Sequence, residues 1–226
     1  MVAELPILLG DTMGLLLKSI ENSPITSICH IFYDTDTLRC VIVDPGSETP
    51  DRIDDFVMSR HLQVDYIVLT HEHFDHIWSC DHFITKYNST LLCTSNCLSA
   101  IQDVRTNLSI FYNQTKAFAV KPKKTIIVGD SNRVIKWIGY DMLFRNSEGH
   151  SFGGLLLSIE KYIVTGDSLI KGIKTVTKLR NASVEKLKET LVLLESMKGK
   201  NLIVCPGHGD IFYLDNYNLS IALGIK

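Results

Sequence analysis

The run His71-Glu72-His73-Phe74-Asp75-His76 constrains the fold most, because it places four side chains of metal-binding type within six residues. It follows directly on Asp65 to Thr70, an apolar segment with the pattern of a β-strand. A hydrophobic core has little use for so many polar groups, because each needs a partner when it is buried. In an extended loop, alternate side chains share a direction, so the first two histidines can reach one ion. The sequence therefore predicts a metal site at the carboxyl end of a strand.

Three further candidate ligands stand at or just past predicted strand ends, and glycines flank all of them. Glycine allows the backbone to approach a site closely. Imidazole and carboxylate are the ligand types that suit zinc and similar ions. Together with the run they give seven candidate ligands for two metal sites, which are His71, His73, Asp75, His76, His150, Asp167 and His208. The other three of the eight histidines are expected to have ordinary surface or core positions.

Strand-like runs ended by turn signals alternate with helical periods along the chain, which predicts a layered α/β or α+β sandwich. The length suits one domain over 1–226. Strands are predicted over 38–43, 65–70, 90–93, 126–128, 134–138, 155–159, 162–165 and 202–205. The fourth and fifth of these are expected to form a hairpin across Gly129-Asp130-Ser131-Asn132. Helices are predicted over 51–61 and 77–87, and from Val184 to Leu194 behind Ser183 as N-cap.

Charge and composition exclude several classes of partner. With 23 basic and 25 acidic side chains, the net charge of −2 favours neither nucleic acid nor an anionic membrane. The segment from Met1 to Leu17 lacks the basic start of a signal peptide, and no apolar run has transmembrane length. The six cysteines lie mostly in apolar segments and form no C-x-x-C pair. We therefore expect reduced cysteines and a cytoplasmic location.

The order His-x-His-x-Asp-His, Gly-His, Gly-Asp and Pro-Gly-His-Gly resembles the pattern of the metallo-β-lactamase-fold superfamily over nearly the whole chain. The resemblance implies an α+β fold, a four-layer αββα sandwich. It also implies one metal ion on His71, His73 and His150 and a second on Asp75, His76 and His208, bridged by Asp167. Asp44, in Asp44-Pro45-Gly46, matches an early turn whose aspartate helps to orient the ligand loop.

Within that superfamily, the segments 165–169 and 206–210 are most similar to glyoxalase II-like enzymes, which hydrolyse thioesters. True glyoxalase II carries a helical C-terminal domain for glutathione, whereas 18 residues follow His208, so glutathione thioesters are not expected. β-Lactamases proper lack an aspartate equivalent to Asp167, and antibiotic hydrolysis is not expected as the native role. Around the histidine that matches His150, the family more often has proline and threonine. This chain has Phe152 there, which is expected to alter the pocket wall.

The expected chemistry is hydrolysis with two zinc ions per chain, iron or manganese being alternatives. Two ions about 3.5–4 Å apart can generate a hydroxide nucleophile at neutral pH. Asp75 and Asp167 are the candidate catalytic residues. A thiolate leaves with little protonation, which favours a thioester or related ester. A lactonase, a phosphodiesterase, a mononuclear-iron sulfur dioxygenase and a diiron electron-transfer module are the alternatives, and the unbroken ligand set argues against a degenerate binding protein.

Substrate specificity is expected to lie in loops around the metals. The segment 106–118 carries Phe111, Tyr112 and Phe118, for which a core role is the alternative. Tyr213 is a further candidate donor to an oxyanion. The basic side chains after Asp167 could meet an anionic substrate group or form a solvated face, and they are Lys171, Lys174, Lys178 and Arg180. The expected partner is a small-molecule substrate; the oligomeric state stays open, a homodimer being one option.

Overall fold

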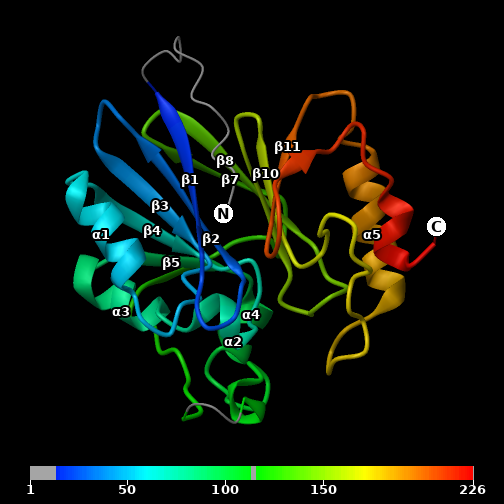
Figure 1. Ribbon diagram of the computed structural model, residues 1–226, viewed down its shortest axis with the longest axis horizontal. Helices are drawn as coiled ribbons and strands as arrows, with labels where there is room; N and C mark the ends of the chain where they lie inside the picture. The colour runs from blue at the N-terminus through cyan, green and yellow to red at the C-terminus, as the bar shows by residue number, and fades with distance from the viewer. Residues whose placement is uncertain (1–13, 113–115, 226) are drawn as a thin grey trace.

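Two mixed β-sheets lie face to face in the computed structural model, which describes residues 14–112 and 116–225 (Figure 1). The first sheet has the order β1 (Leu15–Glu21), β2 (Ile28–Asp34), β3 (Arg39–Val43), β4 (Gln63–Val68), β5 (Thr90–Cys93) and β6 (Thr125–Ile127). The second has the order β12 (Phe212–Tyr213), β11 (Ile203–Pro206), β10 (Tyr162–Gly166), β9 (Leu155–Ile159), β8 (Tyr140–Asn146) and β7 (Arg133–Trp137). Strands β3 to β6 are parallel, as are β10 and β11, and the other neighbouring strands are antiparallel.

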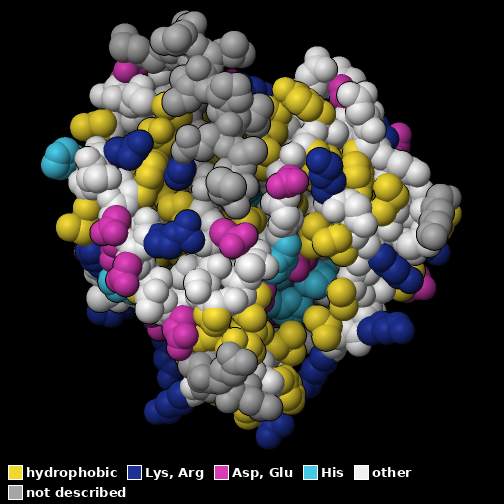
Figure 2. All heavy atoms as spheres, in the orientation of Figure 1, with side chains coloured by type: hydrophobic (Ala, Val, Ile, Leu, Met, Phe, Trp, Pro, Cys, Tyr) yellow, Lys and Arg dark blue, Asp and Glu magenta, His cyan; other side chains and the backbone are white. Residues whose placement is uncertain are grey.

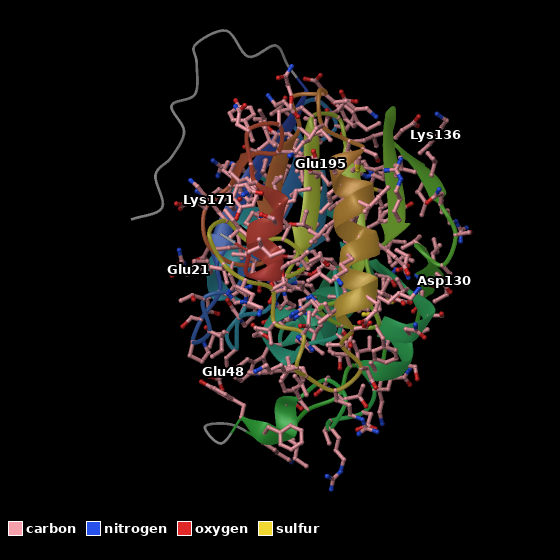
Figure 3. The ribbon with its side chains drawn as sticks, turned by 90° about the vertical axis from the view of Figure 1, so that its right-hand side faces the viewer. Glu21, Glu48, Asp130, Lys136, Lys171 and Glu195 are labelled. Carbon is pink, nitrogen blue, oxygen red and sulfur yellow. The ribbon has the colours of Figure 1, made fainter. Side chains whose placement is uncertain are left out.

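Helices cover the outer face of each sheet. The first sheet is covered by α1 (Asp51–Ser59), α3 (Cys80–Tyr87) and α4 (Ser95–Ala100), and the second by α5 (Val184–Glu195) and the 3₁₀ helix η2 (Leu219–Leu223). Figure 3 shows α5 in front of the second sheet. A short helix, α2 (Phe74–Ile77), and a 3₁₀ turn, η1 (Ser109–Phe111), lie at one end of the molecule. Helix α5 begins as predicted, because the Ser183 hydroxyl accepts a hydrogen bond from the Lys186 amide at 3.3 Å.

Three separate hydrophobic cores divide the molecule into four layers. Strand β9 shows how, because Leu155 and Leu157 belong to the core between the sheets while Leu156 packs under α5. This alternation is the period of a strand that is buried on both faces. On the other side, Ile42 joins the core under α1 and α3, whereas Val41 faces the second sheet. The predicted four-layer αββα sandwich is confirmed.

The hairpin predicted across residues 129–132 is wrong. Strand β6 pairs with β5, with Ile126 opposite Leu92, while β7 pairs with β8 in the other sheet, with Trp137 opposite Tyr140. The segment between β6 and β7 therefore carries the chain from one sheet to the other. The tight turn lies one strand later, at Ile138 and Gly139, which both have positive φ, as in a two-residue hairpin loop.

Two further details differ from the predicted elements. The helix expected over 77–87 is divided into α2 and α3 by Trp78 and Ser79, and strands β1, β2, β8 and β12 were not predicted. All six cysteines are buried and free of disulfides. Among the helices of residues 14–112 and 116–225, none is long and apolar enough to cross a membrane.

Candidate metal centre

The seven predicted ligands converge at the end of the sandwich that carries α2 (Figure 1). The loop after β4 supplies His71 and His73, and α2 supplies Asp75 and His76. His150 comes from the loop between β8 and β9. Asp167 directly follows β10, and His208 is the second residue after the parallel strand β11. Because parallel strands end at the same edge of a sheet, the last two residues arrive side by side. Figure 2 shows histidine side chains in a hollow between the two halves of the molecule.

The donor atoms fall into two groups, each drawn from both halves of the sandwich. His71, His73 and His150 have ligand atoms within 4.8 Å of one another, as do Asp75, His76 and His208. In the first group, His73 Nδ1 lies 3.0 Å from His150 Nε2. These groupings match the two triads that the sequence resemblance implies.

Asp167 lies between the two groups. Its Oδ2 atom is 3.6 Å from His150 Nε2 and 3.6 Å from His208 Nε2, and its Oδ1 atom is 3.5 Å from His76 Nε2. Asp75 Oδ2 faces the second group, at 3.4 Å from His208 Nε2. One carboxylate thus contacts histidines of both triads, which is the position that a bridging ligand needs.

The ring nitrogens that face away from the centre are fixed by hydrogen bonds. His150 Nδ1 donates to the Val176 carbonyl at 2.9 Å, and His208 Nδ1 donates to the Thr26 carbonyl at 3.1 Å. Such bonds leave the Nε2 lone pair directed at the site. Among the described residues, His71 Nε2, His76 Nε2 and Asp167 Oδ1 are buried without any hydrogen-bond partner.

Asp44 fixes the rings of His76 and, through Thr70, of His71. It is buried at a positive φ of 53° and accepts hydrogen bonds from the Thr70 amide at 2.8 Å and from His76 Nδ1 at 2.9 Å. The Thr70 hydroxyl donates to Asp44 at 2.5 Å, so it accepts from His71 Nδ1 at 3.0 Å. The oxygens of Asp44 are thereby committed to Thr70 and His76, which makes it a support for ligands. Thr70 was not singled out in the sequence.

The protonation states suit a metal. Burial, together with the neighbouring His150, lowers the pKa of His73 to about 3, and burial lowers the pKa of His71 well below its usual range. Both rings are therefore neutral at pH 7, as metal ligands must be. Burial opposes protonation of His76 too, but the carboxylates of Asp75, Asp167 and Asp44 outweigh it and raise its pKa to about 10. Such a concentration of carboxylates is neutralised either by a proton or by a cation.

Close backbone approach also distinguishes the site. A Cβ atom on Gly207 would lie 2.1 Å from Asp167 Oδ1 and 2.8 Å from His76 Cε1, so only glycine fits there. The orphaned nitrogens, the neutral imidazoles and the nearby carboxylates together fit divalent ions of the zinc type. The residues that would hold them are the two triads and Asp167.

Glu72 is a buried residue of the run for which no role was predicted. Burial raises its pKa to about 7, and it lies beside Ser151 and Gly153 in the loop that carries His150. A Cβ atom on Gly153 would lie 2.4 Å from Glu72 Oε2. Glu72 therefore packs the loop that carries His71 and His73 against the loop that carries His150.

A groove of about 480 Å³ opens beside the donors, and we call it the side groove. Its wall begins at Phe74, which follows His73 directly, and continues over Arg105, Leu108, Phe111 and Tyr112. The opposite wall is the segment 178–180, two residues beyond the carbonyl that holds His150. In Figure 2, hydrophobic side chains border the histidine hollow, with basic side chains farther out.

The predicted specificity residues separate into two sets. Phe118 stacks on Trp78 at 5.5 Å and packs against the first core, while Tyr112 lies 5.1 Å from Phe74 and lines the side groove. Residues 113–115 of the predicted loop lie outside the described residues. Phe152 is half-buried and is not among the residues that line this groove.

The basic set after Asp167 divides in the same way. Lys178 and Arg180 line the side groove, whereas Lys174 lies against Gly224 near the end of the described chain, and Lys171 is exposed. Tyr213 is misplaced for oxyanion binding. It pairs with Ile203, at the opposite end of β11 from His208, and it is exposed.

The histidines left out of the candidate set have structural partners or lie at the surface. His30 is buried, with Ser19 Oγ on one ring nitrogen and the Pro206 carbonyl on the other. His82 pairs with Asp54 at 2.7 Å, and His61 is exposed after α1.

Comparison with known proteins supplies the family. Over 194 residues the chain is 27% identical to "Probable metallo-hydrolase YqgX" of Bacillus subtilis, which covers 85% of this chain and 89% of that protein. It is 24% identical to a hydroxyacylglutathione hydrolase of Klebsiella pneumoniae, over 74% of this chain and 56% of that protein.

Solved structures share the fold. The BLEG-1 B3 metallo-beta-lactamase superposes with a TM-score of 0.79 at 22% identity, covering 88% of this chain and 94% of that chain. TTHA1623 in a di-iron-bound form superposes with a TM-score of 0.73 at 20% identity, covering 90% of this chain and 96% of that chain. The model of the metallo-beta-lactamase superfamily matches residues 31–208, which include all seven candidate ligands. The chain belongs to the metallo-beta-lactamase superfamily.

Proposed function

We propose that the chain is a binuclear metal-dependent hydrolase that uses two zinc ions to cleave a thioester or related ester of a small molecule. The observation that carries this proposal is the position of Asp167, whose carboxylate lies within 3.6 Å of ring nitrogens from both triads. A site for one ion would not need a second, complete triad beyond this carboxylate. The metallo-hydrolase name of the Bacillus relative agrees with hydrolysis.

When bound, two zinc ions would lower the pKa of water, so that a nucleophile is available at neutral pH, and would polarise the substrate carbonyl. The protein's part is to fix the donors and to orient the reacting groups. Asp75 is held between His76 and His208, whose charges and hydrogen bond outweigh the effect of burial and lower its pKa. It therefore stays ionised and can accept a hydrogen bond from the nucleophile, which orients it. Asp167 contacts histidines of both triads and fixes their relative position.

A thioester suits the surroundings better than an amide. The side groove is lined by aromatic, aliphatic and basic side chains, and no Asp, Glu or His is among its described lining residues. The groove thus offers no carboxylic acid to protonate an amine as it leaves. A thiol has a pKa of about 8.5 and leaves as the thiolate with little protonation.

The test is elemental analysis of the purified full-length chain combined with a substrate panel. We expect two zinc ions per chain and turnover of a thioester at rates above those of matched lactones and phosphodiesters. Turnover of only a lactone or a phosphodiester would retain the metal site and reject the thioester. One iron per chain with oxygen uptake would contradict the proposal. Iron belongs in the analysis because the fold relative TTHA1623 has a di-iron-bound form.

A further inference from the structure

The side groove combines an apolar floor with a basic rim. Phe74, Leu108, Tyr112 and Leu179 supply apolar surface, and Phe74 directly follows His73, so the apolar part begins next to the metal centre. A cavity of about 480 Å³ is in the range of small-molecule sites. A substrate whose reacting bond is at the metals would therefore extend along apolar side chains first.

The floor is held in place by aromatic packing. Phe74 lies 5.1 Å from Tyr112 and 5.6 Å from Trp78, and Trp78 in turn stacks on Phe118 at 5.5 Å. Phe118 belongs to the packing of the first core. The floor is thus anchored to the body of the protein by neighbours outside the groove, which preorganises it for a ligand.

The rim carries Arg105, Lys178 and Arg180. Within residues 14–112 and 116–225, no carboxylate forms an ion pair with any of these side chains. Asp103 is close enough to Arg180 to feel its charge, but its carboxylate already accepts a hydrogen bond from the Arg105 amide at 2.7 Å. Three cations against one acid leave the rim positive, and guanidinium groups bind carboxylate and phosphate well.

We propose that the side groove binds a substrate in which an apolar segment separates the scissile bond from an anionic group, either a carboxylate or a phosphate. This inference rests on the proposed hydrolase function and names the class of its substrate. The apolar segment lies on Phe74, Leu108 and Tyr112, and the anion meets Arg105 and Arg180. The anion can belong to the acyl part or to the thiol part of a thioester.

Paired substrates test the charge. Hexanoyl and adipoyl thioesters of N-acetylcysteamine differ by a carboxylate at the far end of the acyl chain. Hexanoyl thioesters of pantetheine and of phosphopantetheine differ by a phosphate on the thiol side. For the zinc-loaded full-length protein, we expect kcat/KM for one anionic member to exceed that of its neutral partner about tenfold, the factor that 1.4 kcal/mol represents. The pair that responds identifies the side that carries the anion.

A double variant, Arg105→Gln with Arg180→Gln, is expected to reduce this ratio of kcat/KM values towards one. The matched control is Lys171→Gln with Lys174→Gln, which removes the same charge from the neighbouring segment outside the groove and should keep the ratio. Equal kcat/KM for both members of both pairs would overturn the inference. So would an equal loss of the ratio in the control, because it would assign the effect to overall charge.

Binding separates failure of this inference from failure of the proposed function. Trp78 contacts two side chains of the floor, so its fluorescence reports occupancy of the groove. Octanoate should quench it at a concentration about tenfold lower than octanol, and the double variant should remove the difference. If octanoate binds in this way but no thioester is hydrolysed, the inference that the side groove binds an anionic ligand is retained and the proposed hydrolase function is rejected. Octanoate that binds no better than octanol would overturn the inference whatever the enzyme hydrolyses.

Discussion

Four of the five candidate histidine ligands direct one ring nitrogen towards the centre and hold the other in a hydrogen bond to the protein. For His76 that partner is Asp44, and for His71 it is the Thr70 hydroxyl, which Asp44 also holds. A single carboxylate outside the donor set therefore orients one histidine in each triad. Its removal should weaken both metal sites together, although it belongs to neither.

The variant Asp44→Asn tests this role. One oxygen of the asparagine can still accept from the Thr70 amide, but its NH₂ group would face donors at the other position. We expect zinc affinity to fall about 10- to 100-fold, measured by competition with a chromophoric chelator. Asp34→Asn is the control, because Asp34 is also buried and hydrogen-bonded but sits at the far end of β2. Unchanged zinc affinity in Asp44→Asn would show that the ring orientation does not depend on this carboxylate.

The ligands themselves are tested by His73→Ala and Asp75→Ala. Each removes one donor from a different triad, so metal content should fall from about two to about one ion per chain and hydrolysis should be lost. His82→Ala controls for loss of a histidine away from the site. The free energy of unfolding without zinc should change by only about 1 kcal/mol, because neither side chain belongs to the hydrophobic cores. Full activity in both variants would reject the assignment.

The sequence singled out the candidate donors because their chemistry marks them: His, Asp and Gly at strand ends. Their convergence is seen in the structure, and their role as ligands stays a prediction. The residues that hold the donors in place were harder to predict from the sequence. Thr70 and Glu72 act through neighbours that are distant in the chain, such as Asp44 and Gly153. No local pattern distinguishes such a threonine or glutamate from an ordinary one.

At the scale of elements, local sequence signals predicted the strands and helices whose bounds are set by their own residues. Strands β5 and β9 have the predicted bounds, and α5 begins behind Ser183. Strand pairing depends on tertiary structure, which is why the turn residues at 129–132 suggested a hairpin that does not exist. Strand β2 escaped prediction, and its central His30 is satisfied by Ser19 and by the distant Pro206 carbonyl.

One tertiary link between elements makes a prediction about pH. In α1, Asp54 accepts hydrogen bonds from His82 at 2.7 Å and Tyr87 at 2.8 Å, and it pairs with Lys86 at 3.0 Å, all from α3. Burial would raise the pKa of Asp54, but these partners outweigh it and lower the pKa below its usual 3.8. The link therefore contributes stability at pH values above about 4 and loses it as the pH falls through the lowered pKa.

Asp54→Asn should lower the free energy of unfolding by about 1–2 kcal/mol at pH 7, measured by urea denaturation. The difference from the unsubstituted protein should shrink as the pH is lowered below about 4, because Asp54 itself is then protonated. Asp55→Asn, at the exposed neighbouring position of α1, is the control. A difference that stays constant from pH 7 down to pH 2 would show that the ionised carboxylate is not what links the helices.

At the scale of the whole molecule, the candidate metal centre lies where the two halves meet. The first half supplies His71, His73, Asp75 and His76, and the second supplies His150, Asp167 and His208. Each triad draws donors from both halves, so each ion would connect the two sheets. The core between the sheets already holds them together through apolar packing. Metal binding should then add to the stability of the entire sandwich.

We therefore expect zinc to raise the free energy of unfolding of the entire chain, in one cooperative transition. A ligand that binds only the folded state stabilises it by RT ln(1 + [L]/Kd), or about 4 kcal/mol at a free concentration of 1,000 Kd. Chemical denaturation with zinc and with a chelator measures the difference. His150→Ala removes a donor of the second half and should lower the gain, whereas His82→Ala should retain it. If zinc stabilised His150→Ala as strongly as the unsubstituted protein, the ions would be bound within one half, and the site would not join the two sheets.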